Sequence, residues 1–172
     1  MVNAMALLRE HAAGDNPDDL SCSPKLQILF HIIKECKKAG EKLLVFSRHI
    51  FVLDFIRELL KKLHPDIHVL SFDGSVEATV RADMIKKFQK PDSKYSVFLI
   101  STVAGGLGIN LTAANRVVLM DINWNPCHDE QAITRVFRFG QKKSVFIYRL
   151  LMFGTFDETI YKNTIMKQSL SK

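Results

Sequence analysis

Apolar and polar residues follow two different periods along this chain. Short, nearly uninterrupted apolar runs are typical of strands buried on both faces, and we expect such strands at residues 43–46, 67–71, 95–100, 117–121 and 145–150. Elsewhere apolar residues recur three and four positions apart, the pattern of amphipathic helices, which we expect at residues 23–40, 50–63, 77–89 and 156–169. Strands that alternate with helices predict an α/β fold, in which a parallel sheet carries helices on both faces.

One helix start is marked clearly, at Ser23 and Pro24. Serine caps helices and proline favours their first position, and a polar breaker at residues 14–19 comes before them. We therefore expect residues 1–22 to be a segment and linker from a preceding part of the chain, and residues 23–172 to be one domain. No apolar run approaches membrane-spanning length and no signal peptide opens the chain, so we expect no membrane partner.

The amino-acid composition narrows the possible class of protein only slightly. Hydrophobic residues make up 47% and charged residues 24% of the chain, which is ordinary for a globular domain. The formal net charge of +6 permits a polyanionic partner, although most of the lysine pairs fit solvated helix ends equally well. The three cysteines, Cys22, Cys36 and Cys127, have no paired metal-ligand spacing, so we expect reduced thiols and no metal site.

The pattern with the most chemical content is a glutamine followed by two arginines, Gln131, Arg135 and Arg138. Residues three and four apart lie on one face of a helix, so an amide and two guanidinium groups are expected to converge on one anion. Two arginines suit phosphate, because guanidinium donors match phosphate oxygens and phosphoryl transfer gathers negative charge in its transition state. The plain alternative is a solvated basic helix face.

A glycine-rich segment follows the third apolar run. Three of the residues in 105–108 are glycines, and glycine lets the backbone turn sharply and approach a ligand. Ser101, Thr102 and Asn110 add small hydrogen-bonding groups. The segment lacks the Gly-Lys-Ser/Thr of a P-loop, and its glycine spacing does not fit a dinucleotide fingerprint.

The one tryptophan of the chain, Trp124, comes after the fourth apolar run and directly before Asn125-Pro126. Asn-Pro marks a turn, so Trp124 is placed on a loop at the carboxyl end of a strand, where open α/β sheets bind ligands. A packing role in the core or at its rim is one interpretation. A stacking contact with nucleic acid is the other.

These segments, in this order, resemble the later motifs of the Swi/Snf-type DNA translocases of helicase superfamily two. The similarity is carried by Ser-Thr-x-Ala-Gly-Gly-Leu-Gly-Ile-Asn-Leu-Thr from residue 101, Trp-Asn-Pro from residue 124 and Gln-Ala-x-x-Arg-x-x-Arg-x-Gly-Gln from residue 131. It extends from about Ser23 to Lys172 and is most similar to the ATRX-like branch, near the repair translocases. The resemblance implies a RecA-like fold, as the second of the two lobes that such a motor needs.

The resemblance also implies roles for individual residues. Arg135 and Arg138 are implied to be arginine fingers that reach the γ-phosphate of ATP held by the first lobe, with Gln131 in the same cleft. The nucleotide-facing turn is implied to consist of Gly106, Gly108 and Asn110. The residues implied to contact DNA are Ser47, Arg48, Ser101, Thr102 and Trp124, the last of them at the minor groove.

For the whole protein, the resemblance implies an ATPase that moves along double-stranded DNA in the nucleus. ATP and Mg²⁺ would be held mainly by the N-terminal RecA-like lobe, and nucleosomes or repair factors are the further partners it implies. Because no P-loop lysine and no acidic magnesium pair occur here, we expect this chain alone to hydrolyse ATP negligibly. The alternatives are a lobe of an RNA helicase, or a non-catalytic module that binds DNA or protein.

Two positions depart from the family pattern. Arg48 stands where glutamine is common, which leaves its DNA role open. Phe137 and Phe139 replace the more frequent histidine and isoleucine around the second arginine. We expect both phenylalanines to pack the helix against the sheet, as apolar side chains usually do.

Overall fold

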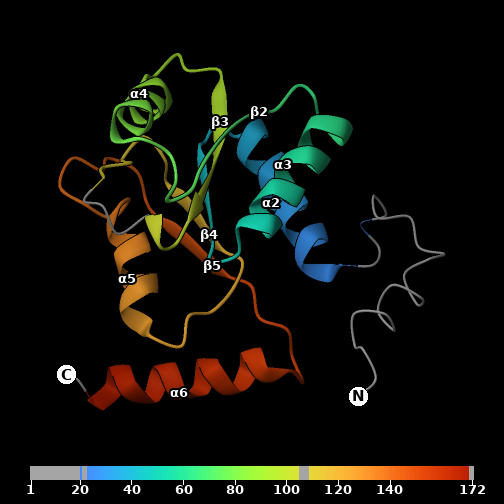
Figure 1. The fold of residues 1–172 in the computed structure, drawn as a ribbon, viewed down its shortest axis with the longest axis vertical. Helices are drawn as coiled ribbons and strands as arrows, with labels where there is room; N and C mark the ends of the chain where they lie inside the picture. Colours follow the sequence, from blue (N-terminus) through green and yellow to red (C-terminus); the bar gives the residue numbers. More distant parts are fainter. Residues whose placement is uncertain (1–19, 21–22, 105–108, 171–172) are drawn as a thin grey trace.

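A computed structural model of the chain describes residue 20 and residues 23–104 and 109–170. Its centre is a parallel sheet in the order β2-β3-β1-β4-β5 (Figure 1). The strands are β1 (Leu43–Ser47), β2 (His68–Phe72), β3 (Tyr95–Ser101), β4 (Arg116–Leu119) and β5 (Phe146–Arg149). Every strand pair is parallel. All the strands therefore begin at one edge of the sheet and end at the opposite edge.

Helices cover both faces of this sheet, as the sequence predicted (Figure 1). The helices are α2 (Pro24–Lys38), α3 (Ile50–Leu63), α4 (Ala78–Gln89), α5 (Pro126–Thr134) and α6 (Phe156–Leu170). One apolar core joins the sheet to α2 and α3, and a second core joins it to α4 and α5. Alternate side chains of β1 enter the two cores, because successive side chains of a strand point to opposite faces. Leu43 and Val45 belong to the first core and Leu44 and Phe46 to the second.

The helix starts follow capping chemistry that the sequence carries locally. Ser23 is the N-cap of α2, with Pro24 at the first helical position. Asn125 caps α5 in the same way: its side-chain oxygen accepts a hydrogen bond from the backbone N–H of Cys127 at 3.1 Å, and Pro126 follows it. Side-chain caps satisfy N–H groups that the first turn of a helix leaves unpaired. These two helices therefore begin at positions that can be located from sequence alone.

The terminal helix is tied to the body by a buried face and by one lysine. Ile160 and Thr164 of α6 are buried. The Lys25 ammonium at the start of α2 donates to Asp157 of α6 at 2.6 Å and to the carbonyl of Met120 at 3.1 Å. This arrangement fixes the beginning of α6 close to the carboxyl end of β4. Among the described residues, no helix has the length and apolar character needed to cross a bilayer.

Candidate functional site

Residues 131–138 do not form one continuous helix, so the prediction that Gln131, Arg135 and Arg138 share one helical face is wrong. Helix α5 ends at Thr134, and Arg135 is its C-cap. One more helical bond follows, from the Phe137 N–H to the Ile133 carbonyl at 3.0 Å, and the chain then turns tightly, with the Arg138 N–H donating to the Val136 carbonyl at 3.0 Å. Gln131, Arg135 and Arg138 therefore do not line one helical face.

Tertiary contacts explain why the helix stops there. The side chain of Val136 is fully buried in the second core, which pulls the backbone toward the sheet. The Arg135 carbonyl accepts a hydrogen bond from the Leu111 N–H at 2.9 Å, so this acceptor is used by another segment. Thr134 is a weak helix former, and its hydroxyl donates back to the Gln131 carbonyl at 2.9 Å.

The two arginines nevertheless lie near one another. Arg135 is half-buried and Arg138 is exposed. Burial lowers the pKa of Arg135, and the positive charge of Arg138 lowers it further. The two positive charges repel each other, and a bound anion would relieve that repulsion.

The glycine-rich segment is described in part. Gly106 and Gly108 lie outside the described residues, so their predicted place at the nucleotide is not addressed. Asn110 is described: it is exposed, and its carbonyl accepts a hydrogen bond from the Gln89 side chain at 2.9 Å. Its neighbour Leu111 is the residue that binds the Arg135 carbonyl. The structure thus brings Asn110 close to residues 135–138, here termed the arginine turn, although the two segments are far apart in the sequence.

Two glutamine side chains hold this arrangement. The Gln89 amide bridges the Asn110 carbonyl and the Ala113 N–H, the latter at 2.8 Å. The Gln141 amide donates to the carbonyls of Thr112 and Ala114 at 3.1 and 2.7 Å. Sequence reasoning assigned neither glutamine a role. Gln141 stood inside the quoted motif, but no sequence signal marked Gln89 at the end of α4.

The edge of the sheet where the strands end carries most of the predicted DNA-contact residues. Ser47, Ser101 and Thr102 are only 1%, 3% and 7% exposed. The Ser47 hydroxyl and the Arg48 backbone N–H both donate to the same carboxylate oxygen of Asp121, at 2.8 and 2.7 Å. Sequence reasoning missed Asp121, whose only signal was its place at the end of an apolar run. Of these residues, only Arg48 is exposed, and its Nε–H donates to His49 Nε2 at 3.0 Å.

Trp124 lies at this same edge and is 52% exposed. Its indole stacks on the ring of Phe156, with centroids 6.0 Å apart and an interplanar angle of 17°. The Lys167 ammonium lies 5.6 Å from the indole centroid. Trp124 is therefore a rim residue: its ring contacts Phe156 and Lys167, and about half of the residue is exposed.

The expectation that Phe137 and Phe139 pack against the sheet is wrong. Their exposed fractions are 72% and 102%. The reason is the early end of α5: the chain leaves the helical path after Arg135, where the Arg138 N–H donates to the Val136 carbonyl. Two exposed phenylalanines therefore flank Arg138 on the surface.

The comparisons with known proteins identify the family of this fold. The family model described as "Helicase conserved C-terminal domain" matches residues 24–140. The chain belongs to this helicase family. Helicase ARIP4 of Homo sapiens is 43% identical over 169 residues, which cover 88% of this chain and 12% of that protein. The Transcriptional regulator ATRX homolog of Drosophila melanogaster is 41% identical and covers 87% of this chain and 13% of its own length.

Further relatives of this helicase domain point the same way. DNA excision repair protein ERCC-6-like of Bos taurus is 43% identical over 149 residues, covering 86% of this chain and 12% of that protein. The solved structure of the C-terminal part of the Fun30 ATPase domain matches with a TM-score of 0.79 at 36% identity, over 88% of this chain and 47% of that chain. The fold is thus the RecA-like C-terminal lobe of a Swi/Snf-type helicase. The chain spans about an eighth of the length of these curated relatives.

Proposed function

We propose that this chain is the C-terminal motor lobe of an ATP-dependent double-stranded-DNA translocase. In this proposal, Arg135 and Arg138 complete a nucleotide site whose other wall is the N-terminal RecA-like lobe. The observation that carries it is the mutual placement of the arginine turn and Asn110, joined by the hydrogen bond from Leu111 to the Arg135 carbonyl. Arginines at such a site stabilise the charge that develops on the transferred phosphoryl group.

The residues present fit the phosphates of ATP but not its magnesium ion. Two neighbouring guanidinium groups, one of them half-buried, are suited to phosphate oxygens. Among the described residues, no group of three or more histidine, cysteine or acidic side chains could hold a metal ion. We therefore place the Mg²⁺ ligands and the P-loop in the first lobe, and we expect the chain alone to turn over ATP negligibly.

The DNA part of the proposal rests on the edge where the strands end. Arg48 supplies an exposed cation and Trp124 a half-exposed aromatic side chain there. We assign the buried Ser47, Ser101 and Thr102 to shaping this edge, on which Arg48 and Trp124 are exposed. Phosphate contacts do not depend on base sequence, which suits a motor that steps along any duplex.

Lobe closure on ATP and opening after hydrolysis would alternate the grip on DNA. The differential contact between the two states is the reach of the arginines across the cleft. The names of the relatives, which include a transcriptional regulator and a DNA excision repair protein, support nuclear work on chromatin or damaged DNA. Nucleosomes and repair factors are accordingly the partners we propose beyond the duplex itself.

The deciding experiment replaces Arg138 with alanine in the protein that contains both lobes. We expect DNA-stimulated ATP hydrolysis to fall by about a thousandfold or more, the size reported for loss of an arginine finger, while ATP binding stays largely in place. Lys34→Ala, which removes an exposed cation of α2, is the matched control and should leave turnover unchanged. Turnover by Arg138→Ala equal to that of the parent would overturn the assignment. Stronger stimulation by RNA than by duplex DNA would favour an RNA helicase instead.

A further inference from the structure

The parallel topology gathers lysines from separate helices at one edge of the lobe. Each of α2, α3 and α4 ends just before a strand begins, so their last turns all lie at the edge where the strands start. Those last turns carry Lys37, Lys38, Lys61, Lys62, Lys86 and Lys87. The helix dipole explains why each pair is tolerated, but only the fold places the pairs together. This edge is opposite to the one that carries Arg48 and Trp124.

One corner of this edge has a hollow and aromatic rings in addition to its positive charge. Beside β2, which is an outer strand of the sheet, the surface has a hollow of about 360 Å³. Its lining includes three cations, Arg57, Lys61 and Lys94, and two aromatic rings, His68 and Tyr95. None of the described residues that line it carries a carboxylate.

The cations of the hollow are not equally available. Arg57 is already paired with Asp54 at 2.9 Å and with Glu58 at 3.5 Å. Lys61 and Lys94 are exposed, and the Lys94 ammonium lies 5.5 Å from the centroid of the Tyr95 ring. The local positive charge that a ligand meets is therefore supplied chiefly by the two lysines.

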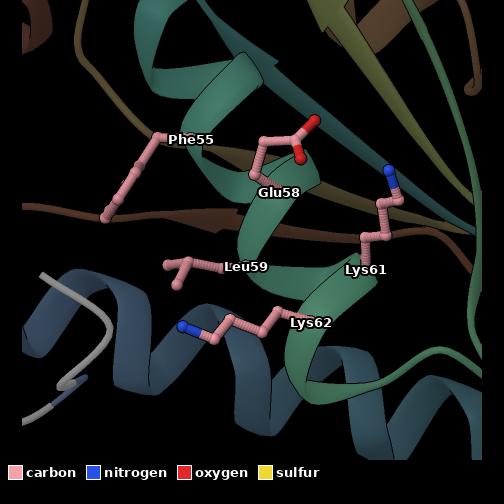
Figure 2. Close-up of a pocket in the computed structure, with 5 residues that line it drawn as sticks. All are labelled: Phe55, Glu58, Leu59, Lys61 and Lys62. Atoms are coloured by element: carbon pink, nitrogen blue, oxygen red, sulfur yellow. The ribbon is translucent and has the colours of Figure 1, made fainter.

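A second hollow of about 350 Å³ adjoins the first and shares Lys61 with it. Figure 2 shows Lys61 and Lys62 leaving the end of α3 on different sides, with Phe55 and Leu59 on the Lys62 side. Glu58 lines this hollow too, but its carboxylate is engaged by Arg57. The end of α3 thus presents ammonium groups toward both hollows.

The aromatic pair gives the corner a surface suited to nucleic acid. The His68 and Tyr95 rings meet edge to face, with centroids 6.3 Å apart and an interplanar angle of 65°. His68 is exposed and Tyr95 is half-buried. Cations interleaved with aromatic rings match a backbone of phosphates and sugars, because the cations pair with phosphate and the rings pack on the sugar.

We propose that this corner, formed by Arg57, Lys61, His68, Lys94 and Tyr95 and here termed the β2 flank, is a second contact surface for duplex DNA. Lys61 and Lys94 hold the phosphates, and the remaining lysines of the edge add a long-range attraction without direct contact. The strands span about 17 Å between the two edges, so one straight duplex cannot lie on both. The β2 flank therefore takes a separate duplex segment, independently of the contacts proposed for Arg48.

The test measures binding of a short fluorescent duplex to the 172-residue chain by anisotropy over a series of salt concentrations. The slope of log K against log salt is negative, and the double substitution Lys61→Gln and Lys94→Gln should make it less negative by about 1.8, because each neutralised phosphate contributes about 0.9. Lys61→Arg with Lys94→Arg should keep the parent slope. The matched control, Lys86→Gln with Lys87→Gln, removes the same charge from the same edge at α4 and should change the slope by less than half as much.

Several results would overturn the proposal. Equal loss by the two glutamine pairs would mean that the edge acts only through its overall charge, and no loss by the Lys61 and Lys94 pair would mean that the flank does not bind. Displacement of the duplex by polyglutamate as effectively as by unlabelled duplex would make the flank a site for acidic proteins. Loss of all binding on replacing Arg48 and Trp124 would also exclude it. Binding that survives that replacement but vanishes with the flank variant would support the flank, and would count against the DNA contacts in the proposed function.

Discussion

Truncation of Gln141 to alanine tests whether one side chain holds the arginine turn against the sheet. Its amide donates to the Ala114 and Thr112 carbonyls at 2.7 and 3.1 Å, and its oxygen accepts from the Lys143 N–H at 2.9 Å. A further, longer contact of 3.4 Å reaches the Val136 carbonyl. These bonds tie together the segment before β4, the arginine turn and the segment before β5.

The expected cost follows from the number of bonds lost. A hydrogen bond contributes a net amount of roughly 0.5–1.5 kcal/mol, and the Gln141 side chain makes three of good length. Gln141 is half-buried, so water can replace part of this loss, and we expect a decrease of about 2 kcal/mol in the free energy of unfolding. For a domain of this size, that corresponds to a fall of about 4–8 °C in Tm.

Chemical denaturation and thermal unfolding of the chain measure this difference directly. Gln131→Ala is the matched control, because Gln131 is an exposed glutamine of the neighbouring helix and its replacement should change stability by no more than about 0.5 kcal/mol. Gln141→Glu should destabilise at least as much as alanine at neutral pH, since a carboxylate oxygen would face two carbonyls. If Gln141→Ala and Gln131→Ala proved equally stable, the amide would not be holding the turn.

Three other substitutions test electrostatics and backbone strain. Burial alone would raise the pKa of Glu41, but hydrogen bonds from Arg116 and Asn115 outweigh it and lower the pKa. The stability that this carboxylate supplies is present above its unfolded pKa and is lost as the pH falls through its folded pKa. Glu41→Gln should therefore lower the free energy of unfolding by roughly 1.5–3 kcal/mol near neutral pH, and by progressively less in urea titrations at acid pH. Burial raises the pKa of Asp129, so its ionised form destabilises the fold and the pH effect is opposite to that of Glu41. Asp129→Asn should be at least as stable as the parent at neutral pH, and any gain in the free energy of unfolding should shrink on acidification. A large loss of stability at neutral pH would contradict this. Gly140 has φ of +101° with nothing within 4 Å of an added Cβ, so Gly140→Ala should lose roughly 1–3 kcal/mol through backbone strain alone, and an unchanged denaturation midpoint would refute that.

The elements that could be predicted are those whose signals are local. Helix α3 was expected at residues 50–63 and lies at Ile50–Leu63, because its apolar spacing is uninterrupted and Pro65 follows it. The strands β1 and β3 were located from apolar runs and lie within one residue of the prediction. The expected beginning of α2 was confirmed as well, since the cap and the proline act within a single turn.

The end of α5 could not be predicted in the same way. The spacing of Gln131, Arg135 and Arg138 is compatible with a helix, and nothing within those residues forbids one. What ends the helix is the burial of Val136 and the hydrogen bond between Leu111 and Arg135, and both depend on segments distant in the chain. Local spacing therefore predicted that the arginines would be neighbours but gave the wrong backbone for them.

By itself, the sequence determined the alternation of strands and helices, the family of the lobe and the residue types available for phosphate, because these depend on periodicity and on motifs read within short windows. Only the tertiary structure decided that Asn110 adjoins the arginine turn, that Asp121 engages Ser47 and Arg48, and that Lys61 and Lys94 share one corner with Tyr95. The physical reason is the parallel sheet: it brings every strand start to one edge and every strand end to the other, and so joins side chains whose proximity no local pattern encodes.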